Sequence, residues 1–228
     1  MRRRLSLLAA AALLTACGGG GGGDLEVRVD YNPGAAWQQL LTTSRSYTAT
    51  GRSSDGRDYV YTLSFAPQGS GTYPRNGAPA ERTERRSSLT PLGGLPVVDL
   101  GSLFFVTGFL LIGLSSASGG CSDISMPFVP PPLSPIGGNG SLFGNTDYAS
   151  CAPGGSSNGS STTRWTIQIY SGDVYFCLDT MQRDGGGAVS LTQSICFGLS
   201  PTGTGLGPKL QYSLVIPGQG FSLVARGG

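Results

Sequence analysis

Carboxylates are the side chains of this chain best suited to acid–base chemistry, because the sequence contains no histidine. Without histidine, Ser-His-Asp and Cys-His catalysis and histidine-ligated metal sites are excluded. Asp147, Asp173 and Asp179 are candidates for the paired carboxylates of a glycosidase. However, no spacing among the 13 acidic residues selects a pair. We therefore predict no catalytic residue, metal site or cofactor, and keep a paired-carboxylate hydrolase of carbohydrates as an alternative.

The N-terminus has the pattern of an export signal. Arginines follow Met1, a short apolar run covers Leu5–Leu14, and small residues and a cysteine close it. The run is about half of the roughly 20 residues that a membrane-spanning helix needs. Leu14-Thr15-Ala16-Cys17 resembles the lipobox of bacterial lipoproteins. This resemblance implies cleavage before Cys17 and a diacylglycerol on its sulfur, with an uncleaved anchor or an ordinary secretory signal as the alternatives.

The residues after Cys17 bear on location. By the same resemblance, Gly18 in place of an aspartate favours the outer membrane of a Gram-negative bacterium. Gly18–Gly23 is a run of six glycines, a composition typical of flexible linkers. We expect a protein of the cell envelope that contacts membrane lipid through acylated Cys17, with an envelope protein or glycan as a further partner.

Composition predicts a β-rich mature domain. The chain has 38 glycines, 15 prolines and few charges, which favours turns over long helices. Without the three signal arginines the side-chain net charge falls from +2 to −1, so we expect no nucleic-acid partner. The predicted organisation is a signal peptide (1–16), a lipidated cysteine with its linker (17–23) and one domain (24–228). This domain has two possible halves, 24–115 and 164–228, joined by a Gly/Ser/Pro-rich loop.

Four cysteines besides Cys17 are expected to form disulfides, because the chain is predicted to be exported and contains no Cys-x-x-Cys pair. Two predicted strands carry Cys177 and Cys196. If these residues are directly opposed in a hairpin, Gly186-Gly187 forms its two-residue turn, which suits glycine. We therefore predict Cys177–Cys196, and Cys121–Cys151 follows by elimination. Free thiols are the alternative.

Most other segments alternate as strands do. Asp55-Gly56 predicts a hairpin between Ser46–Arg52 and Asp58–Phe65. One face of the second strand carries Tyr59, Tyr61, Leu63 and Phe65; we expect this face to be buried, with sugar stacking as the alternative. The remaining expectations are a strand at Leu25–Tyr31, a short helix near Ala35–Thr43, a solvated edge strand or loop at Glu81–Thr90, a loop from Cys121 to Thr163 and a five-strand meander from Arg164 to Ala225.

Leu100–Leu114 is the most apolar internal stretch. It is broken by glycines and is too short for a spanning helix. We predict two buried strands that meet near Thr107-Gly108, with a membrane-contacting segment as the alternative.

Together these features predict an all-β fold: an antiparallel meander or sandwich, or a small barrel-like fold, with one short helix. The expected role is that of a non-enzymatic envelope lipoprotein, structural or binding. The alternatives are the carbohydrate hydrolase and a β-barrel that carries a lipid or another apolar ligand.

Overall fold

A computed structural model describes residues 30–200 and 202–228. The predicted lipobox with Cys17, the glycine run and the first five residues of the predicted strand at Leu25–Tyr31 lie outside these residues. The elements are α1 (Pro33–Thr42), β1 (Arg45–Ser53), β2 (Asp58–Thr72), β3 (Pro79–Pro91), β4 (Val97–Val106), β5 (Leu110–Ser116), β6 (Cys121–Ser125), β7 (Asn139–Tyr148), β8 (Ser157–Tyr170), β9 (Asp173–Asp184), β10 (Val189–Leu199), β11 (Leu206–Ile216), the 3₁₀ turn η1 (Pro217–Gln219) and β12 (Phe221–Gly227).

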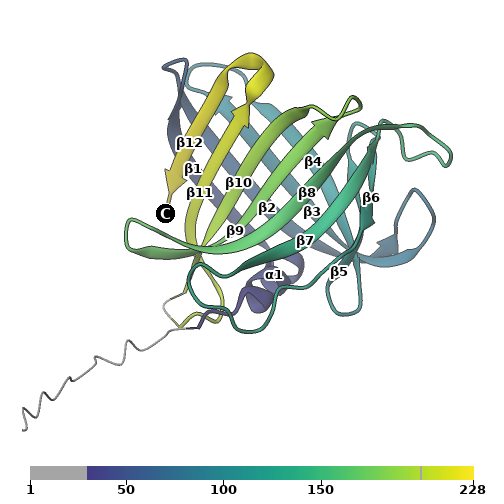
Figure 1. The fold of residues 1–228 in the computed structure, drawn as a ribbon, viewed down its shortest axis with the longest axis horizontal. Coiled ribbons are helices and arrows are strands. Elements are labelled where there is room, and N and C mark those ends of the chain that lie inside the picture. Colours follow the sequence, from purple (N-terminus) through teal and green to yellow (C-terminus); the bar gives the residue numbers. More distant parts are fainter. Residues whose placement is uncertain (1–29, 201) are drawn as a thin grey trace, which may run out of the picture.

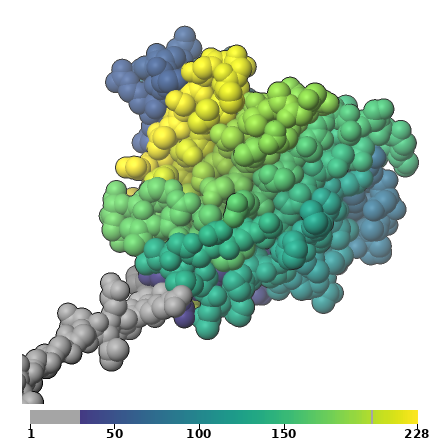
Figure 2. Space-filling model, in the orientation of Figure 1, coloured from purple at the N-terminus to yellow at the C-terminus, as the bar shows by residue number. Residues whose placement is uncertain are grey.

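The twelve strands form a closed antiparallel barrel in which each strand pairs with its neighbours in the sequence (Figure 1). The first strand, β1, closes the ring by pairing with the last, β12, for example Gly51 with Ala225. The predicted all-β fold with one short helix is confirmed, in its barrel form. The C-terminal meander is also confirmed, as β8 to β12. Side chains of these strands cover one side of the molecule as a continuous wall (Figure 2).

Alternation along the strands separates the inside of the barrel from the outside. On β2, Tyr61, Leu63 and Phe65 are buried, whereas Thr62 and Ser64 between them are partly exposed. Successive side chains of a strand point to opposite faces, so the first set fills the interior and the second faces outward. The prediction that this aromatic face is buried is therefore confirmed for Tyr61, Leu63 and Phe65, whereas Tyr59 is partly exposed.

The helix α1 covers one end of the barrel (Figure 1). Pro33 occupies its first turn, and the Asn32 side chain accepts a hydrogen bond from the Ala35 N–H, so the N-terminus is capped. Its buried face turns toward the interior. The Thr83 hydroxyl of β3 donates to the Leu41 carbonyl and fixes the helix against the barrel wall.

Two predictions about irregular segments are wrong. Glu81–Thr90 lies in β3, which pairs with β2 on one side and β4 on the other, so it is not an edge. The segment from Cys121 to Thr163 is not a loop throughout, since it contains β6, β7 and the first half of β8. Glycines and hydroxyl-bearing residues weaken the strand signal of this segment, but pairing with adjacent strands satisfies the hydrogen-bonding groups of its backbone.

The apolar stretch Leu100–Leu114 forms two strands, as predicted. It contributes the C-terminal part of β4 and most of β5, with the turn at Thr107-Gly108 between them. Phe105 and Leu111 join the main core, while Phe104 faces outward and packs on Tyr73, with 5.4 Å between ring centroids. Among the described residues, none of the exposed large apolar side chains belongs to Leu100–Leu114.

Both predicted disulfides are present in the structure, Cys121–Cys151 and Cys177–Cys196. Cys177 is directly opposed to Cys196, as predicted, but the predicted turn is wrong. The Gly187 N–H donates to the Asp184 carbonyl at 2.9 Å, and Gly187 has a φ of +84°. This is a longer turn ending in a left-handed glycine. A register shift between Val189 and Leu191 absorbs the extra residue.

Candidate functional site

The barrel encloses a cavity of about 360 Å³. Small-molecule sites have volumes of roughly 300–1,000 Å³, so this space suits a small ligand. An eight-stranded barrel is just wide enough to be filled by side chains, and twelve strands leave more room. The residues that line the cavity belong to α1 and to strands β2 to β10; they are Trp37, Leu40, Leu41, Phe65, Arg85, Asp99, Gly101, Ser102, Leu103, Leu114, Ser115, Ser122, Phe143, Asn145, Asp147, Ser161, Thr163, Leu178, Thr180, Gln182, Leu191, Gln193, Ile195 and Phe197.

The helix forms an apolar floor for the cavity. Trp37, Leu40 and Leu41 line it from α1, and all three are buried, as is Phe197 on β10. The Trp37 indole N–H donates to the Phe109 carbonyl at 3.0 Å, which satisfies its one polar group. The floor is therefore closed and offers no unpaired donor from Trp37, and the apolar surface open to the cavity comes from partly buried wall residues such as Phe143 and Leu178.

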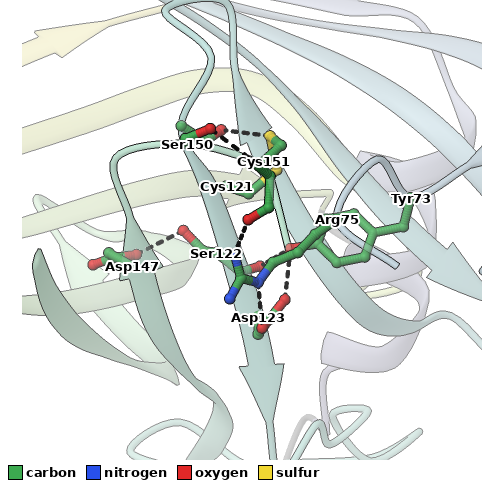
Figure 3. Close-up of polar contacts among 10 residues, drawn as sticks. Tyr73, Arg75, Cys121, Ser122, Asp123, Asp147, Ser150 and Cys151 are labelled. Atoms are coloured by element: carbon green, nitrogen blue, oxygen red, sulfur yellow. Dashed lines mark hydrogen bonds and ion pairs between the residues drawn. A yellow bond between two sulfur atoms is a disulfide. The ribbon is translucent and has the colours of Figure 1, made fainter. Parts of the chain in front are cut away.

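A hydrogen-bonded network forms one wall of the cavity. Asp147 accepts from the Ser122 hydroxyl at 2.6 Å and from the Asn145 amide at 2.5 Å, and the Ser161 hydroxyl donates to the Asn145 carbonyl oxygen. These residues come from β6, β7 and β8, and Figure 3 shows Ser122 reaching Asp147. The network holds amide and carboxylate groups in fixed positions, as a site for a polar ligand requires.

Arg85 of β3 and Asp99 of β4 form an ion pair at the cavity wall. Their side chains are 35% and 54% exposed, whereas the floor residue Leu41 is fully buried. Solvent therefore reaches the polar wall but not the helix end. An ion pair with this exposure contributes little to stability, so its charges can interact with a ligand at modest cost.

Two stacked tyrosines lie near this ion pair. Tyr61 and Tyr212 have ring centroids 3.7 Å apart and are nearly parallel. Burial raises the pKa of Tyr212 to about 12, with Arg85 opposing part of the increase. Burial also raises the pKa of Tyr61 well above its usual value, and the neighbouring Tyr212 adds to the increase. Both hydroxyls are therefore neutral at physiological pH, and the two rings belong to the core of the barrel.

The three candidate carboxylates do not form one site. Asp147 lines the cavity, but Asp173 pairs with Lys209 at 2.7 Å. Asp179 accepts hydrogen bonds from Ser194 and Thr166 and borders a separate groove on the outer face of β8 to β11. The described residues contain no group of three or more His, Cys, Asp or Glu placed to hold a metal ion.

Sequence reasoning missed most of the polar cavity residues, including Arg85, Asp99, Asn145 and Gln193. The available signal was weak. Arg85 lies in a stretch with charges on both faces, and such a stretch resembles a solvated strand until its neighbours are known. Barrel closure is what turns one of those faces inward.

A second polar cluster lies on the outside of the barrel (Figure 3). Asp123 of β6 pairs with Arg75 at 2.8 Å and accepts a hydrogen bond from the Tyr73 hydroxyl at 2.9 Å. Burial raises the pKa of Tyr73, and its hydrogen bond to Asp123 adds to this. The Arg75 guanidinium also lies 3.4 Å from the centre of the Tyr148 ring. The cluster joins the β2–β3 turn to β6 and β7, beside the Cys121–Cys151 disulfide, which is a structural role.

Comparisons of the chain with protein-family models, curated proteins and solved structures found no match. None of the helices in the described residues has the length and apolar character needed to cross a membrane. The interpretation of the site therefore depends on its own geometry.

Proposed function

We propose that this protein is a lipid-anchored lipoprotein of the bacterial envelope whose barrel binds a small amphiphilic molecule, with no catalytic step. The observation that carries the proposal is the cavity inside the barrel, with an apolar floor and a polar, solvent-reached wall. The predicted lipobox at Leu14–Cys17 supports the anchor, and Gly18 after it supports the outer-membrane location. Of the two roles first expected, binding is favoured over a purely structural one.

The distribution of polarity indicates the kind of ligand. Partly buried Phe143 and Leu178 offer apolar surface inside the cavity, above its closed floor, where an acyl chain or a ring is favourably buried. Arg85, Asn145 and Asp147 offer donors and acceptors to a head group. A molecule with one apolar and one polar end satisfies both surfaces, whereas a fully polar sugar leaves the apolar part of the lining without a partner.

A neutral apolar fluorophore, N-phenyl-1-naphthylamine, tests this proposal. The wild-type protein is expected to bind it saturably, with enhanced emission. Thr180 faces the cavity, so Thr180→Trp places an indole in the binding space and should abolish the enhancement. Thr48 is exposed on β1, and the matched control Thr48→Trp adds the same indole without blocking the cavity.

Circular dichroism establishes that both variants are folded. Ser161→Phe, on the neighbouring strand β8, is a second variant that blocks the cavity. Equal binding by the wild-type, Thr180→Trp and Ser161→Phe proteins contradicts the proposal. Mass spectrometry of the mature protein separately tests the acyl chains on Cys17.

A further inference from the structure

The loop between β6 and β7 exposes apolar side chains. Residues 126–138 contain no charged residue, and Met126 and Leu133 are 73% and 64% exposed. Single exposed apolar residues are common, but several together mark an interaction surface. We call these side chains the apolar loop surface; they are Met126, Phe128, Val129, Leu133 and Ile136.

The backbone of this loop is held in place. The Tyr31 and Ser134 main chains exchange two hydrogen bonds of 2.8 Å, and the Gly34 N–H donates to the Pro131 carbonyl at 3.1 Å. The consecutive prolines at 130–132 restrict φ further. The loop cannot easily turn its apolar side chains inward, so their exposure is built into the fold.

The loop lies at the end of the barrel that α1 covers, beside the start of the described chain (Figure 1). Cys17 precedes Asp30 by 13 residues. Even fully extended, 13 residues span at most about 45 Å. An acyl group on Cys17 therefore keeps the apolar loop surface close to the membrane that holds the anchor.

We propose that the apolar loop surface inserts into the interfacial layer of this membrane. The helix end of the barrel then faces the lipid, and the solvent-reached wall of the cavity faces away. This inference rests on the lipid anchor of the proposed function. A surface of aliphatic and aromatic groups without charge suits a lipid interface, and tethering raises its effective concentration there, so weak partitioning suffices.

The turn between β3 and β4 provides a matched control. Thr83 contacts α1 near the start of β3, so the turn after Pro91 lies at the opposite end of the barrel. This turn is itself apolar and exposed: Leu95 is 87% exposed, and Leu92 and Val97 beside it are 77% and 72% exposed. The inference predicts that Leu95 does not contact lipid, although exposure alone would favour it.

The test uses the full-length lipidated protein in vesicles of phosphatidylethanolamine and phosphatidylglycerol, with or without bromine in the upper acyl chains. Leu133→Trp and Leu95→Trp each add one indole to a background of two buried tryptophans, Trp37 and Trp165. Brominated lipid should remove most of the added emission of Leu133→Trp and leave that of Leu95→Trp unchanged. Met126→Trp replaces Leu133→Trp if the latter does not fold.

The outcomes separate this inference from the proposed function. An acylated, vesicle-bound protein in which the Leu133→Trp and Met126→Trp indoles are not quenched overturns the membrane-facing loop alone. Equal quenching of Leu133→Trp and Leu95→Trp overturns the orientation. A mature protein without acyl chains on Cys17, measured by mass spectrometry, overturns both the anchor and this inference, while dye binding in the cavity is still judged by its own assay.

Discussion

The buried tyrosine pair predicts a loss of stability at alkaline pH. Tyr212 is 4% exposed, and burial raises its pKa from 10.0 to about 12. Above pH 10 the unfolded chain loses this proton while the folded protein keeps it, so rising pH favours unfolding. Each pKa unit is worth about 1.4 kcal/mol, so Tyr212 alone removes about 2 kcal/mol of the free energy of unfolding by pH 12, where the folded protein has lost half of this proton. This contribution is complete below pH 10 and is lost as the pH approaches 12.

Tyr212→Phe tests this reasoning, because it keeps the ring stacked on Tyr61 and removes the ionisable hydroxyl. Urea unfolding at pH 8 and at pH values between 10 and 12 measures the free energy of unfolding of both proteins. The wild-type protein should lose about 2 kcal/mol more than the variant over this interval. Tyr61→Phe should also reduce the loss of unfolding free energy with rising pH, since the pKa of Tyr61 is raised as well. Identical pH slopes for the wild-type and both variants would refute the argument.

Two further predictions concern the barrel wall. In Gly51→Ala the new Cβ lies 1.9 Å from the Val224 carbonyl oxygen across the β1–β12 pairing, whereas Gly71→Ala has nothing within 4 Å. Calorimetry should show a loss of about 1–3 kcal/mol or more for the first variant and little change for the second; equal losses would contradict the packing argument. Under native conditions a thiol reductant should open Cys121–Cys151 before Cys177–Cys196, because Cys151 is partly exposed whereas Cys177 and Cys196 are buried. Mass spectrometry after alkylation follows both bridges, and the reverse order would show that exposure does not control access.

Local patterns predicted much of the fold. The Asp55-Gly56 turn and the alternation of Tyr61, Leu63 and Phe65 located the first hairpin, because both signals act between residues close in the sequence. The opposition of Cys177 and Cys196 was predicted for the same reason. The shape of their turn was not, because a single bulge beside it changes the register without altering the flanking pattern.

These local patterns could not predict the cavity, because it exists only when the barrel is closed. Arg85 and Asp99 occupy strands whose two faces both carry polar groups, and nothing local distinguishes the inner face. The short strand β6 was hidden for a related reason. Its residues Cys121–Ser125 carry few apolar groups, so its place depends on pairing with β5 and β7.

The pairing of β1 with β12 also determines when the barrel can form. Thr50 lies near the start of the described chain and its partner Arg226 near the end, and contacts between such distant residues form slowly. Until the seven residues of β12 arrive, β1 and β11 each present an unpaired edge that can bind a strand of another molecule. A chain of this design is therefore most prone to aggregation while β12 is still unpaired, and a chaperone that shields strand edges would have its greatest effect at that stage.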